Sequence, residues 1–316
     1  MIKPYTLAID IGGSKLVTAL VSREGRVLAK RRAAWPALDA QTVIDTIIRE
    51  SQTLLETLSG YTPSLIGATI PGLADPRQGL WIESTFSGIS HLPLTQALSD
   101  VFSIPAYADN DGQACALAEK LYGSCRENTD FLYITVSNGI GGALFLNDRL
   151  YCGAYGKAGE IGHSVAVEHG RRCACGKHGC LEMHAAGPGL ALNYRELGGR
   201  PAPDGSPAQG ELIAKRAAEG EAAALEAFRM EGVYLGRALA FACNLLNPGK
   251  VIIGGGLSLA YALYAGALEA TLREGLYQSA NQSLTIEPTA LGYDGGLLGA
   301  AAVAYCRAEH LYHYCQ

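Results

Sequence analysis

The chain has 316 residues, of which 48% are hydrophobic and 17% charged, and its formal net charge is -5. This length and balance are typical of a globular protein with two lobes, and they exclude a small peptide module and a disordered chain. The acidic charge argues against a nucleic-acid-binding protein, and no uncharged stretch is long enough for a signal peptide or a membrane span, so we expect a cytoplasmic protein.

Short apolar blocks separated by turn residues dominate the first third of the chain. Residues 5–35 predict a strand, a glycine turn, a strand, a hairpin at Glu24-Gly25 and a third strand. Apolar residues at helical spacing predict a helix over 40–58. The next expected elements are a strand at 65–70, a break at Pro71-Gly72, a helix at 94–102, a strand ending at Ala108 and a helix at 112–121.

The opening pattern returns at Phe131, where FLYITVSNGIGGALFLNDRLYCGAYG again predicts strand, glycine loop, strand, turn and strand. Such a weak internal duplication indicates two lobes with a cleft between them. We expect a smaller lobe of residues 1–111, completed by the C-terminal helix at about 294–316, and a larger lobe of residues 112–293.

The larger lobe contains a Pro- and Gly-rich surface loop at 198–210. The elements expected beyond it are a helix over 211–246 with a break near Gly220, a strand at 250–253, a glycine triplet, a helix ending at Arg273, a strand at 284–288 and a helix of small residues from 294.

Two glycine loops follow predicted strands. After the first strand stands Asp10-Ile11-Gly12-Gly13-Ser14-Lys15, where backbone N–H groups could bind an anion and the acid could hold magnesium. Taken alone, a strand-end Asp before Gly-Gly is more often plain turn chemistry. The loop Ser137-Asn138-Gly139-Ile140-Gly141-Gly142 stands at the equivalent point of the repeat. Two such loops at matching places suit a nucleotide triphosphate.

The stretch Asp109-Asn110-Asp111 lies at a strand-to-helix junction. Asn and Asp are common helix caps, which is the simpler interpretation. An Asp at a strand end could also accept the proton of a substrate hydroxyl.

Three cysteines and a histidine crowd into a short glycine-rich stretch. Cys173, Cys175, Cys180 and His163 form a complete tetrahedral set for zinc, which leaves no position for a catalytic water and indicates a structural metal. The tight spacing requires the glycines at 176 and 179. His178 as the fourth ligand, or three reduced cysteines without metal, are the alternatives.

Two acids flank this stretch. Glu160 precedes His163 by three residues and Glu182 follows Cys180 by two, so the metal site would bring two carboxylates together. Carboxylates beside backbone amides bind the vicinal hydroxyls of sugars, although either acid alone could be a surface charge.

The motifs DIGGSK, ADND, GEIGH and CxCGxxGCLE, with GGG before the last helices, resemble the ROK family (repressors, open reading frames, kinases) of bacterial sugar kinases over about residues 5–304. The resemblance implies a two-lobed α/β fold of the actin-like ATPase, ribonuclease H-like type. It also implies ATP-dependent phosphorylation of the C6 hydroxyl of a hexose or N-acetylhexosamine, with Mg²⁺, a structural Zn²⁺ and a homodimer or homotetramer.

The same resemblance implies a role for each motif residue, with Asp111 as the catalytic base. The residues that would hold the sugar are Gly72, Asn110, Asp111, Glu160, His163 and Glu182, and those that would hold the zinc are His163, Cys173, Cys175 and Cys180. Asp10 would hold the magnesium. The ATP phosphates would be bound by Gly12, Gly13, Ser14, Lys15 and the loop that contains Ser137, Asn138 and Gly139, and the adenosine by Gly254, Gly255 and Gly256.

Three departures from the family pattern leave the sugar open. The chain has Ser137-Asn138 where the family's glucokinases usually have Thr-Gly, residues 85–89 read TFSGI where many members have Asn-Leu-Pro-Gly-Trp, and Ala186-Gly187 replaces a Ser-Gly pair. The candidate substrates are glucose, mannose, fructose, allose, N-acetylglucosamine and N-acetylmannosamine. The alternatives are a sugar-binding pseudokinase, or a sugar-sensing ROK protein without a DNA-binding domain, because only nine residues precede Asp10.

Overall fold

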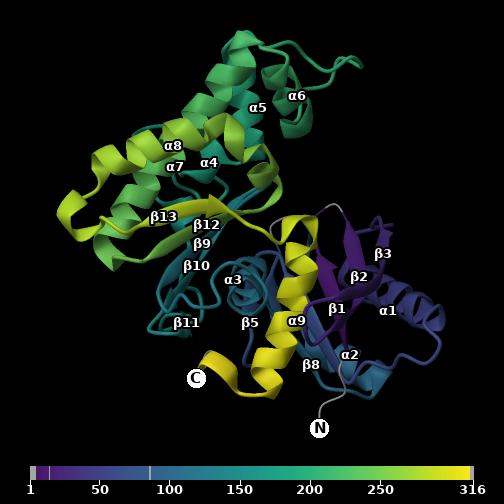
Figure 1. Cartoon of the computed structure of the whole chain (residues 1–316). Coiled ribbons are helices and arrows are strands. Elements are labelled where there is room, and N and C mark those ends of the chain that lie inside the picture. Colours follow the sequence, from purple (N-terminus) through teal and green to yellow (C-terminus); the bar gives the residue numbers. More distant parts are fainter. Residues whose placement is uncertain (1–4, 14, 85–86, 314–316) are drawn as a thin grey trace. The chain divides into compact units, whose positions relative to one another are not determined.

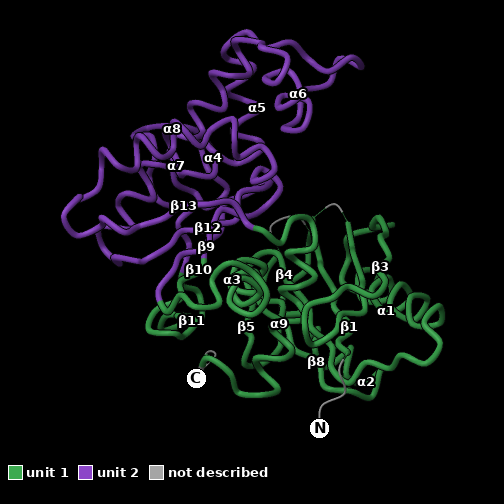
Figure 2. Tube along the Cα trace, in the orientation of Figure 1, with its two compact units in different colours: residues 1–129, 143–158, 290–316 green, residues 130–142, 159–289 purple. Residues whose placement is uncertain are grey.

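The computed structural model describes residues 5–13, 15–84 and 87–313. By its contacts the chain forms two compact units, coloured separately in Figure 2. The first unit comprises Met1–Thr129, Ala143–Ala158 and Ala290–Gln316, and the second comprises Asp130–Gly142 and Gly159–Thr289.

A five-stranded sheet forms the centre of the first unit, with the order β3-β2-β1-β4-β8. Antiparallel pairing joins β1 to β2 and β2 to β3, whereas β1–β4 and β4–β8 pair in parallel. The expected opening hairpins are therefore confirmed. The strands are β1 (Tyr5–Ile11), β2 (Leu16–Ser22), β3 (Val27–Ala33), β4 (Leu65–Ile70) and β8 (Ala106–Asn110).

Helices pack against this sheet. The helix α1 (Ala40–Glu56) begins at Asp39, whose side chain accepts a hydrogen bond from the Thr42 N–H, and it buries Val43, Ile47 and Leu54. The other helices of this unit are α2 (Leu94–Phe102), α3 (Asp111–Leu121) and α9 (Gly295–Ala308), drawn in Figure 1.

The packing of α9 is unusually close. A Cβ placed on Gly67 of β4 would lie 1.8 Å from the carbonyl oxygen of Ala300, so the sheet and the helix meet backbone to backbone. Residues Leu297–Cys306 of this helix are all buried. The C-terminal helix thus completes the core of the N-terminal unit.

A small antiparallel sheet was not expected from the sequence. It consists of β5 (Leu73–Asp75), β6 (Leu80–Glu83) and β7 (Ser90–Leu92), and it buries Trp81. Its strands have three or four residues each. Such short strands carry too little alternation to be recognised.

The second five-stranded sheet repeats the order of the first, as β11-β10-β9-β12-β13. Here β10–β11 is the hairpin, and β9–β12 and β12–β13 are the parallel pairs. The predicted duplication is confirmed at the level of strand order. The strands are β9 (Phe131–Val136), β10 (Ile140–Leu146), β11 (Arg149–Tyr151), β12 (Lys250–Gly254) and β13 (Thr285–Pro288), of which β11 and the part of β10 from Ala143 are counted with the first unit.

The helices of the second unit include two short ones, α4 (Glu182–Ala185) and α5 (Gly187–Glu196), that were not predicted. The helix expected over 211–246 is divided into α6 (Gly210–Ala218) and α7 (Ala222–Leu246), with the break at Gly220 as predicted. The helix α8 (Tyr261–Gly275) packs along α7.

The helix α7 encloses an ionisable group. The side chain of Glu231 is fully buried, and neither carboxylate oxygen has a hydrogen-bond partner within the described part of the chain. Burial raises the pKa of Glu231 well above its usual value, because an ionised carboxylate is poorly solvated there.

The expected boundary at residue 111 differs from the division seen in the contacts, which keeps 112–129 and 143–158 with the first unit. The reason is that α3 packs against α9 and is held with it.

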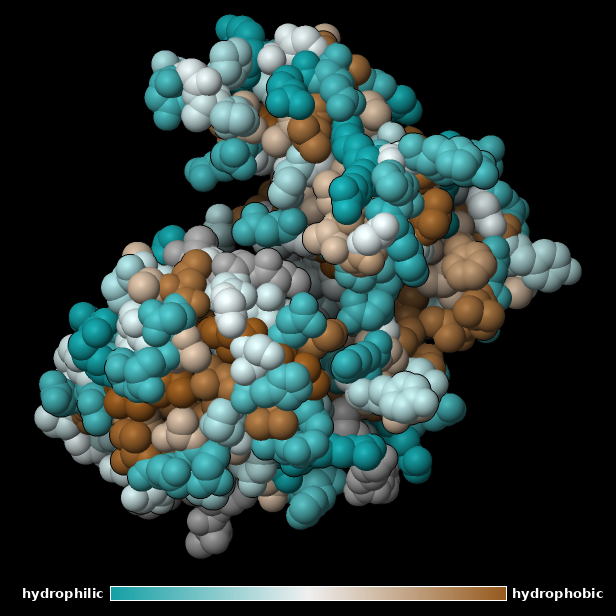
Figure 3. Space-filling model, turned by 180° about the vertical axis from the view of Figure 1, so that it is seen from behind, coloured by the Kyte–Doolittle hydropathy of each residue, from teal (hydrophilic) through white to brown (hydrophobic). Residues whose placement is uncertain are grey.

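Figure 3 shows hydrophilic and hydrophobic side chains interspersed on the face drawn there. Across the described residues, no helix combines the length and apolar character needed to cross a membrane.

Candidate active site

Asp10 lies near the end of β1, opposite Thr69 of the parallel neighbour β4. The Thr69 hydroxyl donates to Asp10 Oδ1 over 2.9 Å, and the Ile11 N–H donates to the same hydroxyl over 3.2 Å. Burial raises the pKa of Asp10, against the opposing effects of the Thr69 hydrogen bond and the Lys15 charge. A strand-end carboxylate held in this way is chemically suited to magnesium.

The turn after β1 is closed by its own backbone. The Gly12 N–H donates to the Lys15 carbonyl over 2.9 Å, and the Trp35 indole N–H donates to the Gly12 carbonyl over 2.9 Å. Gly13 is exposed, and Ser14 lies outside the described residues. The structure thus places a compact turn beside Asp10.

Gly296, in the first turn of α9, lies against the Asp10 carboxylate. A Cβ on Gly296 would lie 2.5 Å from the Asp10 carboxyl carbon, so only glycine leaves room for this acid. Sequence reasoning missed both Gly296 and Thr69, because both are remote from Asp10 in the chain. The Asp-Gly-Gly triplet at 294–296 is the signal that could have indicated the first of them.

The β8–α3 junction differs from the prediction by two residues. The strand runs on through Asn110 and the helix begins at Asp111, so these polar residues end a strand that was expected to stop at Ala108. Asn110 is the helix cap, since its Oδ1 accepts from the Gly112 N–H over 2.9 Å. The capping interpretation therefore holds for Asn110, while Asp111 stands in the first helical turn, where the helix dipole favours negative charge.

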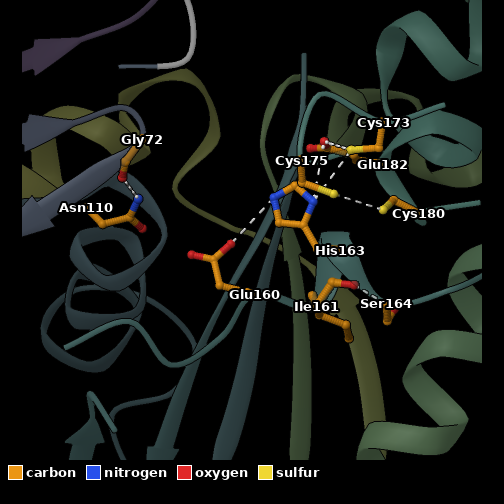
Figure 4. Close-up of polar contacts among 10 residues, drawn as sticks. All are labelled: Gly72, Asn110, Glu160, Ile161, His163, Ser164, Cys173, Cys175, Cys180 and Glu182. Atoms are coloured by element: carbon orange, nitrogen blue, oxygen red, sulfur yellow. Dashed lines mark hydrogen bonds and ion pairs between the residues drawn. The ribbon is translucent and has the colours of Figure 1, made fainter. Parts of the chain in front are cut away.

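Asn110 also fixes the loop that follows β4. Its Nδ2 donates to the Gly72 carbonyl over 2.9 Å, as Figure 4 shows. Gly72 has φ +96°, and a Cβ there would lie 2.4 Å from the Glu83 carbonyl oxygen. The structure therefore brings two of the predicted sugar-binding residues of the first unit into direct contact.

In the second unit, the cysteine loop is held by short-range backbone bonds. The Cys173 N–H donates to the Lys177 carbonyl over 2.8 Å, and the Gly179 N–H donates to the Arg171 carbonyl over 2.8 Å. Gly176 and Gly179 have φ of +89° and +80°, conformations that favour glycine. The predicted need for both glycines is confirmed.

The four predicted metal ligands come together, as Figure 4 shows. Their ligand atoms all lie within 4.8 Å of one another; the Cys175 and Cys180 sulfurs are 3.5 Å apart, and Cys173 Sγ is 3.7 Å from His163 Nδ1. Zn–S bonds of about 2.3 Å and a Zn–N bond of about 2.0–2.1 Å place sulfurs about 3.8 Å apart, and sulfur and nitrogen about 3.5 Å apart. The donor set fits zinc, and His178 does not belong to it.

The orientation of His163 assigns its two nitrogens. Nδ1 points toward Cys173, and Nε2 lies 3.8 Å from Glu160 Oε2. If Nδ1 binds the metal, Nε2 carries the proton and is directed to an acceptor, the arrangement found at metal-bound histidines. The imidazole side chain is 34% exposed, so a ligand can reach it.

Glu182 lies on the other side of the same ring. Its Oε1 is 3.6 Å from His163 Nδ1 and accepts a hydrogen bond from the Cys173 thiol over 3.1 Å. Burial raises the pKa of Cys173 to about 12 in the metal-free cluster. Both predicted acids therefore lie beside the cluster, as the sequence indicated.

The two glycine loops of the second unit also touch. They follow β9 and β12, which pair in parallel, so both emerge at the same edge of the sheet. A Cβ on Gly255 would lie 2.4 Å from the Val136 carbonyl oxygen, and one on Gly256 would lie 3.7 Å from Ser137 Oγ. Gly254 packs on Tyr133, and Asn138 is exposed.

Arg171 is a structural residue that sequence reasoning missed. Its guanidinium donates to the Met183 carbonyl over 3.0 Å and to Glu196 Oε2 over 2.7 Å, and its backbone N–H donates to His184 Nε2 over 3.3 Å. It thereby ties the cysteine loop to α4 and α5. The sequence showed it only as half of a short basic pair.

The sequence model of the ROK family matches residues 6–306. The chain belongs to the ROK family. Among curated ROK-type relatives, the N-acetylmannosamine kinase of Escherichia fergusonii is 33% identical over 301 residues, covering 95% of this chain and 98% of that enzyme.

Solved structures agree on the ROK fold. A ROK family glucokinase from Streptomyces griseus, in complex with glucose and AMPPNP, has a TM-score of 0.84 at 27% identity and covers 95% of this chain and 99% of its own. A ROK family transcriptional regulator, a homologue of the E. coli MLC protein, has a TM-score of 0.85 at 28% identity, with coverage of 95% and 77%. The chain therefore has the two-lobed actin-like ATPase fold.

Proposed function

We propose that this protein is an ATP-dependent kinase that phosphorylates the C6 hydroxyl of an N-acetylhexosamine or hexose, with N-acetylmannosamine as the first candidate. The observation that carries the proposal is the Glu160–His163–Glu182 group beside the Cys₃His cluster, in a chain that matches N-acetylmannosamine kinases over 95% of its length. The departures at Asn138 and in the 85–89 segment are the reason for not choosing glucose first; Thr85 and Phe86 lie outside the described residues.

Binding of the sugar is assigned to polar groups that are already oriented. Glu160 and Glu182 would accept hydrogen bonds from ring hydroxyls, and His163 Nε2 would donate one. The first unit adds the Asn110 amide, held by Gly72. Zinc, when bound, would fix His163 and the cysteine loop and supply no further chemistry, since protein ligands fill all four positions.

The chemical step is assigned to Asp111. Phosphoryl transfer depends mainly on placement and charge neutralisation, so the base needs only to orient the hydroxyl and receive its proton late in the reaction. One oxygen of Asp111 accepts the Gly112 N–H over 2.8 Å, which fixes the carboxylate at the start of α3. Magnesium, held through Asp10, would neutralise phosphate charge.

Nucleotide binding is assigned to the glycine loops, namely Gly12 to Lys15 in the first unit, and Ser137 to Gly142 and Gly254 to Gly256 in the second. Their backbone N–H groups are suited to phosphate oxygens, because no side chain hinders a close approach.

ADP release, followed with a coupled assay against the six candidate sugars, tests the proposal. We expect turnover with at least one sugar and a phosphate on C6 of the product, read by NMR. Asp111→Asn should lower turnover by about 10²–10⁴-fold and preserve sugar binding. Asp39→Asn, the same change at the cap of α1, is the matched control and should leave turnover unchanged.

If no sugar gives ADP above the background ATPase rate, the kinase proposal fails. Calorimetric binding of a sugar by such an inactive protein would support the sugar-sensing alternative, which the similarity to a ROK transcriptional regulator favours. The homodimer or homotetramer remains a prediction, to be measured by light scattering.

A further inference from the structure

Gly139 lies where the glycine loop after β9 meets Glu182. A Cβ built on Gly139 would lie 3.2 Å from Glu182 Oε2, tighter than an ordinary van der Waals contact. Among the described residues other than its chain neighbours, no further atom would lie within 4 Å of this Cβ. The Ser137 N–H donates to the Gly139 carbonyl over 2.9 Å and closes the turn. A methyl group at this position would therefore require the carboxylate to move by a few tenths of an ångström.

The loop is also joined by a backbone hydrogen bond to the segment that follows α4. The Gly187 N–H, at the start of α5, donates to the Ser137 carbonyl over 2.7 Å. The loop cannot shift without moving the start of α5 or breaking that bond. Only Ala186 separates α5 from α4, which begins at Glu182, so the position of Glu182 is linked to that of the loop.

On its other side Glu182 faces the metal cluster. Its Oε1 lies 3.1 Å from Cys173 Sγ, and its side chain is only 21% exposed. The carboxylate is thus confined between the cluster and Gly139, and a methyl group at 139 would displace it.

We propose that Gly139 is a positioning residue for Glu182, and that this contact couples nucleotide binding at the loop to sugar binding at the carboxylate. The coupling rests on the proposed function, in which the loop holds phosphates and Glu182 holds sugar hydroxyls. By linkage, a nucleotide that orders the loop should tighten sugar binding, and the sugar should tighten nucleotide binding by the same factor.

Gly139→Ala and Gly210→Ala form a matched pair. Neither glycine has a positive φ, and the added Cβ meets a side-chain atom at 3.2 Å in both, but at Gly210, the first residue of α6, that atom belongs to a methyl group of Leu257. The measurement is the sugar Kd by calorimetry, with and without a non-hydrolysable ATP analogue. We expect Gly139→Ala to weaken sugar binding by about tenfold and to reduce the coupling factor toward one, whereas Gly210→Ala keeps both.

A double-mutant cycle separates positioning from general damage. On a Glu182→Ala background, Gly139→Ala should have no further effect on the sugar Kd, because the group through which it acts is gone. Glu182→Asp, with a carboxylate one methylene shorter, should recover part of the affinity that Gly139→Ala loses. Equal losses from Gly139→Ala with and without the Glu182 side chain would overturn the role.

A second readout needs no sugar. Cys173 donates to Glu182, so displacement of the carboxylate should change the rate at which a thiol reagent modifies the cluster cysteines in the presence of a chelator. We expect Gly139→Ala to change this rate by about threefold or more relative to Gly210→Ala. If the wild-type protein binds no sugar, the proposed function fails, but the rate of thiol modification still tests whether Gly139 positions Glu182. Identical modification rates and identical sugar affinities in the two variants would refute the positioning role.

Discussion

Glu231→Met should stabilise the second unit. Glu231 is fully buried in α7 and its oxygens have no hydrogen-bond partner among the residues described. An unsatisfied buried polar group costs about 1–3 kcal/mol, and methionine fills a similar volume without one. For a unit of roughly 150 residues, each kcal/mol corresponds to about 2–4 °C in the melting temperature.

The same residue predicts a pH dependence with a definite sign. The folded state holds the Glu231 proton more tightly than the unfolded state, because burial raises the folded pKa above 4.5. The stability from this proton is therefore fully present below the unfolded pKa and is lost as pH rises through the raised folded pKa. As pH rises above 4.5, wild-type protein should therefore lose more stability than Glu231→Met does.

Differential scanning fluorimetry or calorimetry at several pH values measures both effects. Glu226→Met on the same helix is the matched control, because Glu226 is partly exposed and pairs with Arg229, and such surface changes stay within about 0.5 kcal/mol. If Glu231→Met melts at or below the wild-type temperature while the control is neutral, the carboxyl must have a compensating partner and the reasoning is refuted.

Three further predictions concern the proposed site. Asp10→Asn should lower turnover by more than about tenfold, because the carboxylate that would hold magnesium is lost. The same change should raise the melting temperature at neutral pH, because burial raises the Asp10 pKa and an ionised acid there lowers the stability of the fold. A fall in both turnover and melting temperature would contradict this. Elemental analysis should find about one zinc per chain. Cys175→Ser should reduce the zinc content, whereas the control Cys115→Ala should not. An active, folded preparation without zinc would contradict the assignment of the zinc site. Gly176→Ala should cost about 1–2 kcal/mol from its left-handed φ alone, because a Cβ there meets no atom of the described residues within 4 Å. Gly179→Ala should cost more and lower the zinc content, because its Cβ would lie 1.8 Å from the Val167 carbonyl oxygen. Equal losses of stability in denaturant unfolding would count against the described loop.

Strong local patterns made much of the fold predictable. Val43, Ile47 and Leu54 repeat at helical spacing and indeed form the buried face of α1. The duplicated strand pattern likewise predicted the two matching hairpin units, which are β1 to β3 and β9 to β11 in the two sheets. The three-residue strands β5 and β7 were missed, because they contain too few residues to show a period.

The candidate site divides in the same way. The metal ligands are close in the chain, so their spacing alone predicted the cluster. The Thr69–Asp10 hydrogen bond joins residues 59 apart, and nothing local marks Thr69 as a partner. The contact of Gly139 with Glu182 was also invisible, since it depends on how a loop and a helix pack.

The close fit of α9 on β4 has a consequence for how the protein is made. The sheet is assembled from residues near the N-terminus, yet the backbone that lies against Gly67 belongs to Ala300. A growing polypeptide leaves the ribosome N-terminus first, so the lobe that is translated earliest has an open apolar surface until the last segment emerges. Truncation or stalling before α9 should therefore yield a chain that depends on chaperones, even though every strand of that sheet has already been synthesised.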